Sequence, residues 1–216
     1  DGNVQDVVPN VRKGNGPSGW GDAATVIPWV LYHEYDDKVM LETQYQSMKG
    51  WVKYLKSRAK ENYIYPGGRY GDWLSFSSTA SDYPGAFTDK EFVGTAYFAR
   101  STQLLAQAAQ ILGKEEDRKT YSELLSRIKQ SFQKEFVTRN GRLSPNTQTA
   151  YVLALSFDLL PEDIRKDAAQ RLADDVRKFG HITTGFLGTP EICNVLSDYG
   201  HDDEAYMLLF RKKFPS

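Results

Sequence analysis

Two short segments of the chain place a tryptophan beside an aspartate among glycines. The first is SGWGDAA (18–24), which contains Trp20 and Asp22, and the second is GDW (71–73), which contains Asp72 and Trp73. An indole ring offers a flat apolar face to the C–H bonds of a ligand, and a carboxylate accepts hydrogen bonds from hydroxyl groups. Glycine allows the backbone to bring both groups close to a ligand. This combination is typical of a site that binds sugar rings.

The carboxylates also have structural interpretations. Asp22 directly precedes an apolar segment and is suited to cap the helix that begins there, and Asp72 is suited to cap a turn. Glu91 stands three residues after Thr88, which is the spacing of a capping box. Ligand contact and a structural role are therefore both open for Asp22 and Asp72, whereas Glu91 is assigned a structural role.

The four tryptophans fall into two groups. Trp29 and Trp51 lie within stripes of apolar residues at helical spacing, which predicts packing in the core. Trp20 and Trp73 lie in segments without that spacing, where contact with a ligand is as well supported as packing. The aromatic content of 13% is consistent with either a ligand-stacking surface or a tyrosine-rich core.

The composition limits the possible partners and cofactors. A formal net charge of −1 gives no reason to expect a nucleic acid or a membrane surface as partner. No apolar run reaches the length of a membrane-spanning helix, so we expect no membrane insertion. The single cysteine excludes an internal disulfide, and the three histidines are far apart, without HExxH or CxxC spacing. We therefore expect no zinc site.

Helical periodicity dominates the chain and predicts an all-α fold. Eight segments carry the pattern, and there is little strand signal. The predicted helices span residues 23–35, 38–62, 91–113, 115–137, 147–160, 161–180, 190–200 and 202–213.

The connections between these helices alternate in character. Those at 35–38, 113–116, 160–163 and 200–203 are short, whereas those at 11–22, 63–88, 138–147 and 180–189 are long or rich in Gly, Pro and Thr. A short connection joins antiparallel neighbours, so every second connection lies on the same side of a series of hairpins. We therefore expect the elaborate loops, which include the segments of Trp20 and Trp73, to share one face.

The helices also alternate in polarity. Those after the elaborate loops are more apolar all round, and those after the short connections are amphipathic and charged. An apolar helix is buried and an amphipathic one lies outside, so the pattern predicts an inner ring of helices within an outer ring. A TPR-like solenoid is the rival architecture, but the hairpin turns near residues 36, 114, 161 and 201 are unevenly spaced and no 34-residue motif repeats.

The order of several motifs resembles that of a known enzyme family. SGWGDAA, GDWL, TQTA and TTGFLGTP occur in this order, and their combination is similar to the catalytic domain of bacterial α-L-rhamnosidases of glycoside hydrolase family 78. The resemblance covers essentially the whole chain. It implies an (α/α)6 barrel of six helical hairpins. The eight helices predicted here would form four of the six. Residues 1–216 would then be part of one catalytic domain that lacks its N-terminal and C-terminal portions.

The resemblance also implies a reaction. The family hydrolyses terminal α-L-rhamnosyl residues with inversion, which needs a general acid and a general base about 6.5–9.5 Å apart. In the family the acid belongs to a motif similar to RDERxGWxGD, which would precede residue 1. The base belongs to a TxWE segment after a YPSW stretch, and FPS (214–216) resembles the beginning of that stretch. We therefore expect no catalytic acid or base within these 216 residues.

The resemblance assigns the chain to the walls of the substrate pocket. Trp20 and Trp73 match the aromatic residues that line the family's rhamnose pocket, and Asp22 and Asp72 beside them are the next candidates for substrate binding. A rhamnose-containing carbohydrate is the implied substrate, no cofactor or metal is implied, and a periplasmic or secreted location is favoured over the cytoplasm.

Three alternatives are compatible with the residues alone. The chain could belong to a non-catalytic helical toroid that binds carbohydrate, to another (α/α)6 glycosidase, or to a helical scaffold for protein partners. A scaffold would not need tryptophan and glycine concentrated in every second loop. An incomplete barrel would expose the faces of its inner helices, so we expect the isolated segment to be poorly stable or to associate.

Overall fold

The computed structural model describes residues 2–9, 14, 16–76 and 87–213. The chain divides into two compact units. The first comprises residues 1–69 and 94–131, and the second comprises residues 70–93 and 132–216. The FPS segment at 214–216, which resembles the beginning of the family's base motif, lies outside the described residues.

The all-α prediction is confirmed. The described residues form eight helices, and their only β pairing is an isolated bridge between Val137 and Leu143. The helices are α1 (Ala23–Tyr35), α2 (Lys38–Arg58), α3 (Lys90–Ile111), α4 (Glu115–Phe136), α5 (Gln148–Ser156), α6 (Glu162–Phe179), α7 (Ile192–Asp198) and α8 (Asp202–Leu209).

Each helix lies where the periodicity predicted it, and the differences are at the ends. The largest are in α2, α5 and α8, each of which ends four residues before its predicted limit. In α2 the backbone turns extended at Ala59, and the N–H of Tyr63 then donates to the carbonyl of Lys60, which closes a turn instead of a further helical turn. Periodicity alone does not show such a change of backbone conformation.

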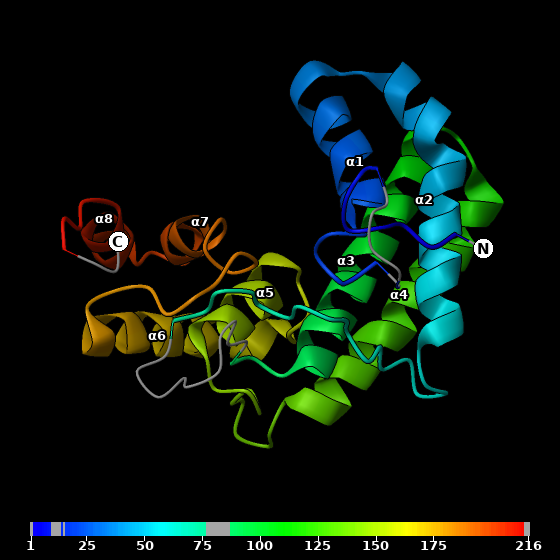
Figure 1. Cartoon of the computed structure of the whole chain (residues 1–216). Coiled ribbons are helices and arrows are strands. Elements are labelled where there is room, and N and C mark those ends of the chain that lie inside the picture. The colour runs from blue at the N-terminus through cyan, green and yellow to red at the C-terminus, as the bar shows by residue number, and fades with distance from the viewer. Residues whose placement is uncertain (1, 10–13, 15, 77–86, 214–216) are drawn as a thin grey trace. The chain divides into compact units, whose positions relative to one another are not determined.

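The first unit contains the hairpin of α1 and α2, which Figure 1 shows as neighbouring antiparallel helices. The apolar stripe that forms the buried face of α2 consists of Leu41, Tyr45, Met48, Trp51, Val52, Tyr54 and Leu55. Trp51 is completely buried, as its place in this stripe predicted. The ring therefore has a fixed position from which its indole N–H can serve a neighbouring loop.

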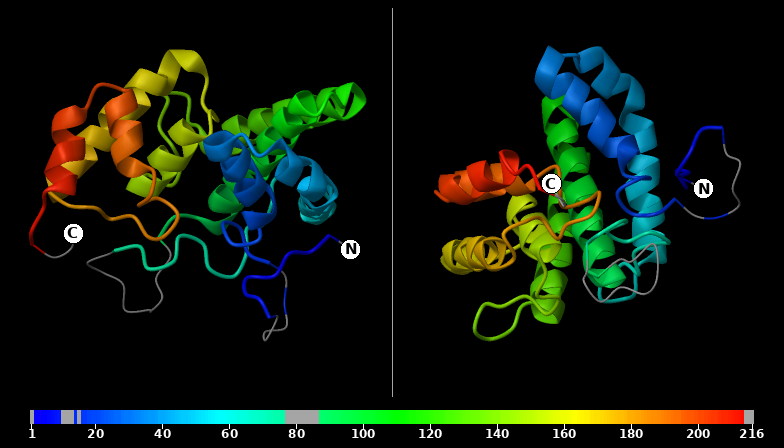
Figure 2. Two further views of the ribbon diagram at one scale, coloured as in Figure 1. Left: turned by 90° about the horizontal axis from the view of Figure 1, so that it is seen from above. Right: turned by 60° about the vertical axis from the view of Figure 1, so that its left-hand side comes forward.

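The second unit contains α5 to α8, and here the predicted alternation of inner and outer helices is clear. Every residue of α5 from Gln148 to Leu155 is buried, whereas α6 buries only the face formed by Ala168, Ala169, Leu172, Ala173 and Val176. Figure 2 shows from two further directions that α5 lies beside α6 and α7 beside α8. A helix that is buried all round requires neighbours on every side, so α5 is the centre of this unit.

Helix α1 is apolar like α5 but is not buried all round. Only Thr25 and Pro28 are buried, while Ile27 and Val30 are 55% and 46% exposed. The expectation that the inner helices of this segment would have exposed apolar faces therefore fits α1 and does not fit α5.

The beginning of α3 corrects one prediction. The backbone N–H of Phe92 donates to Oδ1 of Asp89 at 3.0 Å, so Asp89 is the residue that caps this helix. The predicted capping box of Thr88 and Glu91 is therefore wrong by one residue. The Thr88 hydroxyl instead pairs with the hydroxyl of Thr147 at 2.7 Å. Asp competes well with Thr at an N-cap position, and the buried partner of Thr88 cannot be read from local spacing.

Candidate functional site

The first tryptophan-bearing loop lies in the first unit and runs from Pro17 to Asp22. Its backbone forms a tight turn in which the N–H of Gly21 donates to the carbonyl of Pro17 at 2.9 Å. Trp20, at the tip of this turn, remains partly exposed, whereas Asp22 is fully buried at the beginning of α1. The loop thus presents its ring to the surface and keeps its carboxylate beneath.

The Asp22 carboxylate is held by three donors. Its Oδ2 accepts from the backbone N–H of Gly19 at 2.8 Å, and its Oδ1 accepts from Nε1 of Trp51 at 2.8 Å and from the Ser101 hydroxyl at 2.5 Å. These bonds join the loop to α2 and α3. Although Asp22 is the residue before α1, its side chain makes no capping bond to that helix. The interpretation of Asp22 as a side-chain cap is therefore wrong.

Burial and hydrogen bonding act on this carboxyl in opposite directions. Removal from water disfavours the ionised form and is the larger effect, while the bonds from Ser101, Trp51 and Gly19 favour it. The net result raises the pKa of Asp22 to about 6. An unpaired buried carboxylate would cost far more, so the three donors are what allow an acid to occupy this position.

Gly21 is required by the contact between this loop and Trp51. A Cβ at residue 21 would lie 2.4 Å from Cη2 of the Trp51 ring, and that ring is fully buried and cannot move aside. Glycine therefore allows the turn to lie directly against the indole.

The second tryptophan-bearing loop belongs to the second unit, and its carboxylate is bound in a similar way. The Asp72 carboxylate is fully buried. Its Oδ2 accepts from the Thr149 hydroxyl at 2.5 Å and from the N–H of Gly185 at 2.7 Å, and its Oδ1 accepts from the N–H of Leu187 at 2.9 Å. Burial raises the pKa of Asp72, and these bonds partly oppose that effect. Asp72 therefore joins its own loop to α5 and to the 184–189 loop.

Trp73 is partly exposed in the loop that Asp72 joins to the 184–189 loop. Its carbonyl accepts from the N–H of Phe186 at 2.9 Å, and the Tyr70 ring meets the indole edge-on at a centroid distance of 4.8 Å. A Cβ at Gly185 would lie 2.3 Å from the Trp73 carbonyl oxygen, so glycine is needed for the two loops to approach. The predicted gathering of the GDW and TTGFLGT segments is confirmed within this unit.

Sequence reasoning did not identify the partners of the two aspartates. Ser101 was not singled out, and Trp51 was assigned to the core without its role as a donor. Thr149 and Gln148 were noted only as members of the TQT segment. Gln148 is fully buried, and its Oε1 accepts from the N–H of Thr183 at 2.8 Å, which holds the 180–189 loop against α5. The signal that could have found it is the polar TQT at the beginning of an otherwise apolar helix.

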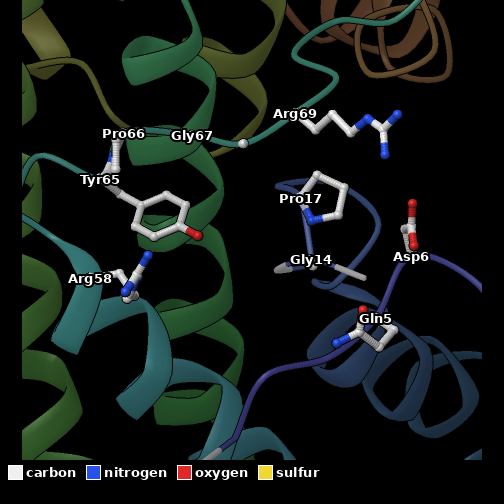
Figure 3. A pocket seen from close by; sticks show the side chains of 11 residues that line it. Gln5, Asp6, Gly14, Pro17, Arg58, Tyr65, Pro66, Gly67 and Arg69 are labelled. Atoms are coloured by element: carbon white, nitrogen blue, oxygen red, sulfur yellow. The ribbon is translucent and has the colours of Figure 1, made fainter. Parts of the chain in front are cut away.

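A cavity of about 380 Å³ lies beside the first loop, and Pro17 forms part of its lining. Figure 3 shows the Tyr65 ring extending into it, with Arg58 on one side and Pro17 and Arg69 on the other. Tyr65 is the one aromatic ring among the described lining residues, and Trp20 is not one of them. The cavity is therefore unlike the stacking site predicted for a sugar.

No cluster of three or more His, Cys, Asp or Glu side chains suited to a metal ion occurs within the described part of the chain. Among the helices of the described residues, none combines the length and the apolar character that crossing a bilayer requires.

The match to a known family covers all 216 residues, and that family is described as the bacterial α-L-rhamnosidase six-hairpin glycosidase domain. The chain belongs to this family. Its sequence is 43% identical over 218 residues to an α-L-rhamnosidase of Streptomyces avermitilis and 38% identical over 220 residues to one of Formosa agariphila. Each match covers 100% of this chain but only 20% and 23% of the respective relative.

Solved structures give the same result. A crystal structure of the Streptomyces avermitilis α-L-rhamnosidase, complexed with L-rhamnose, matches this chain with a TM-score of 0.91 and 42% identity. The α-L-rhamnosidase of Aspergillus terreus matches with a TM-score of 0.89 and 36% identity. Both matches cover 100% of this chain and 20% and 26% of the other chain, so the chain spans about a fifth to a quarter of these relatives.

Proposed function

We propose that this chain forms part of the catalytic domain of an α-L-rhamnosidase, which hydrolyses terminal α-L-rhamnosyl residues of glycans or glycosides with inversion. The observation that carries the proposal is the match of the entire chain to this family, with 43% identity to an α-L-rhamnosidase. The hydrolase of Streptomyces avermitilis, with 42% identity in the structural match, was crystallised with L-rhamnose. A rhamnose-containing carbohydrate is accordingly the proposed substrate.

Within this function the chain supplies substrate-binding residues, and the general acid and base come from outside residues 1–216. Trp20 and Trp73 are the proposed contact residues because each ring is partly exposed, in a loop whose neighbouring aspartate is held by buried hydrogen bonds. Asp22 and Asp72 serve the site by positioning, since both carboxylates are fully buried and bonded to their own unit. The role proposed for Asp22 and Asp72 is therefore to position the two loops, in place of the direct contact with the sugar that the sequence led us to expect.

The experiment that tests the activity is hydrolysis of an aryl α-L-rhamnoside by the full-length gene product. The 216-residue chain and an aryl α-glucoside serve as controls. Turnover of the rhamnoside by the full-length protein alone is the expected result. Absence of turnover of either glycoside by the full-length protein would overturn the proposal in favour of a non-catalytic carbohydrate-binding protein. Turnover by the 216-residue chain would place an acid and a base within it.

The contact roles have a separate test. Trp20→Ala and Trp73→Ala in the full-length protein are each expected to lower kcat/KM for the rhamnoside by about tenfold or more, because each removes an aromatic face from the sugar. Trp29→Ala is the matched control, since this ring lies in α1 outside both loops. Unchanged kinetics in Trp20→Ala or Trp73→Ala would refute the contact role of that residue.

A further inference from the structure

The second unit holds a cavity of about 280 Å³ that the proposed contact residues do not line. It opens among the end of α6, the segment before α5, and residues 75, 76, 87 and 88. The side chains that matter for its chemistry are Phe76, Phe87, Asn146, Asp175, Phe179 and His181. Its back wall includes Thr149, whose hydroxyl donates to Asp72. The cavity is therefore the immediate neighbour of the loop that carries Trp73.

The walls of the cavity are aromatic and accessible. Phe87 and Phe179, which border the cavity, are 53% and 45% exposed to solvent. Exposed apolar side chains that gather around a cavity are typical of a ligand-binding surface. His181 meets the Phe76 ring edge-on at a centroid distance of 5.3 Å and the Phe179 ring at 5.9 Å. These contacts hold the rings at different angles around the space, so that a flat, partly apolar ligand can lie against them.

Polar groups enter the same cavity at defined orientations. The hydroxyl of Tyr151 donates to Oδ1 of Asn146 at 2.9 Å, which leaves the amide nitrogen as the donor end of that side chain. Nδ1 of His181 lies 2.7 Å from the carbonyl of Ile182. Because a carbonyl only accepts, Nδ1 is the donor in this contact.

Asp175 supplies a carboxylate in the same wall. It is partly buried, and this burial raises its pKa, while a hydrogen bond from Gln148 acts in the opposite direction. Gln148 is itself fully buried, its Oε1 accepts from the N–H of Thr183, and its Nε2 donates to the carbonyl of His181. A carboxylate, an amide donor and an imidazole around aromatic rings are the groups that bind the hydroxyls and the C–H faces of a pyranose.

We propose that this cavity is a second sugar subsite, which binds the neutral pyranose to which the cleaved rhamnose is linked. The inference rests on the proposed function, because the cavity adjoins the loop of Trp73. In this arrangement Phe76, Phe87 and Phe179 pack against the ring of the leaving sugar, and Asn146, Asp175 and His181 bind its hydroxyl groups. The subsite gives the enzyme a preference for rhamnose linked to another sugar.

The test compares two substrates of the full-length protein. The first is a rhamnosyl-glucose disaccharide, tested as a set of compounds that differ in the linkage between α-L-rhamnose and glucose. The second is α-L-rhamnosyl fluoride, which has no sugar beyond the cleaved bond. The ratio of their kcat/KM values is measured for Phe179→Ala and Asp175→Asn. We expect each substitution to lower the disaccharide-to-fluoride ratio by about tenfold, the loss typical of one aromatic or charged contact.

Matched variants separate this effect from general damage. Phe210→Ala removes another exposed phenylalanine of the second unit, and Asp174→Asn neutralises the neighbouring carboxylate, and neither residue lines the cavity. Both are expected to keep the wild-type ratio. An unchanged ratio in Phe179→Ala and Asp175→Asn, or an equal fall in the two control variants, would overturn the inference even where both substrates are hydrolysed.

A binding measurement keeps the two proposals apart. If the wild-type protein hydrolyses neither substrate, the proposed function fails, and the cavity is tested by saturation-transfer NMR with methyl β-D-glucopyranoside and methyl β-D-galactopyranoside. Transfer that is strong in wild type and lost in Phe179→Ala supports a sugar site in this cavity. Absence of transfer in wild type, or equal transfer in the variant, rejects it.

Discussion

The indole nitrogen of Trp51 lies 2.8 Å from the carboxylate of Asp22, and both side chains are completely buried. This bond connects the middle of α2 to the loop that carries Trp20. A long helix with a well-packed face is a rigid element, so the bond transmits that rigidity to a loop that glycine would otherwise leave free. The position of the partly exposed Trp20 ring therefore depends on two buried residues beneath it.

The first prediction concerns the pH dependence of stability at Asp22. Its pKa is about 6 in the folded protein and 3.8 in an ordinary environment, so the folded state binds the proton more tightly. The contribution of Asp22 to stability is therefore fully present below pH about 4, falls as the pH rises to about 6 and then levels off. Between pH 4 and pH 7 the change amounts to about 2–3 kcal/mol.

Asp22→Asn removes this titration. The free energy of unfolding of wild type minus that of the variant, measured by urea denaturation of the full-length protein, should be larger at pH 4 than at pH 7 by about 2–3 kcal/mol. The amide also turns a donor toward a donor, a further cost of about 1–3 kcal/mol that does not depend on pH. A difference that is the same at both pH values would contradict the proposed titration.

The roles of Asp22 and Asp72 show where prediction from the sequence ends. The pairing of tryptophan, aspartate and glycine was visible, and so was the likeness of the two loops. The partners were not, because Ser101 and Thr149 are 79 and 77 residues away in sequence from the aspartates that they contact. Local spacing favours a capping role for an acid before a helix, and tertiary hydrogen bonds overrode that preference at Asp22.

A second prediction follows from the contact between Gly21 and Trp51. Gly21→Ala places a methyl group 2.4 Å from Cη2 of a ring that has no exposed surface, so the turn or the ring must shift. We expect a loss of about 1–3 kcal/mol in the free energy of unfolding, which is the usual cost of overpacking. Displacement of the turn should also lower kcat/KM for an aryl rhamnoside.

Gly50→Ala provides the matched comparison. This glycine lies inside α2, and the nearest atom to an added Cβ is the Cα of Gly2 at 3.5 Å, an ordinary contact. Alanine favours a helix over glycine by about 0.5–1 kcal/mol, so this variant should be as stable as wild type or more stable. Equal urea midpoints for Gly21→Ala and Gly50→Ala would show that the space beside Trp51 is not limiting.

The capping of α3 gives a third prediction. Asp89→Ala removes the acceptor of the Phe92 N–H and should lower the free energy of unfolding by about 1 kcal/mol. Asp89→Asn retains the acceptor oxygen and should recover most of that loss. Glu91→Gln should cost less than Asp89→Ala, because the bond to the Phe92 N–H comes from Asp89. Circular dichroism during urea unfolding measures all three, and a larger loss in Glu91→Gln than in Asp89→Ala would restore the capping box.

The fold itself was largely predictable because helical periodicity is local. In α6 the apolar residues recur at helical spacing and form one buried face, and in α5 the absence of a polar face correctly predicted burial all round. Helix α1 has a similarly apolar sequence, yet Ile27 and Val30 are largely exposed. The pattern of polar residues predicts how much of a helix surface is apolar, but it does not show which segment packs against that surface.

The last prediction tests whether Asp72 positions the loop of Trp73. Thr149→Val keeps the shape of the buried side chain but removes the hydroxyl that donates to the Asp72 carboxylate, so it should cost about 1–3 kcal/mol of unfolding free energy. Thr149→Ser retains that donor at the price of one methyl group and should restore the bond. If Asp72 acts only through stability, both variants should show wild-type kcat/KM for an aryl rhamnoside at a temperature where both are folded. If it positions Trp73, kcat/KM should fall in Thr149→Val and recover in Thr149→Ser, because only the second variant holds the 72–75 loop against α5.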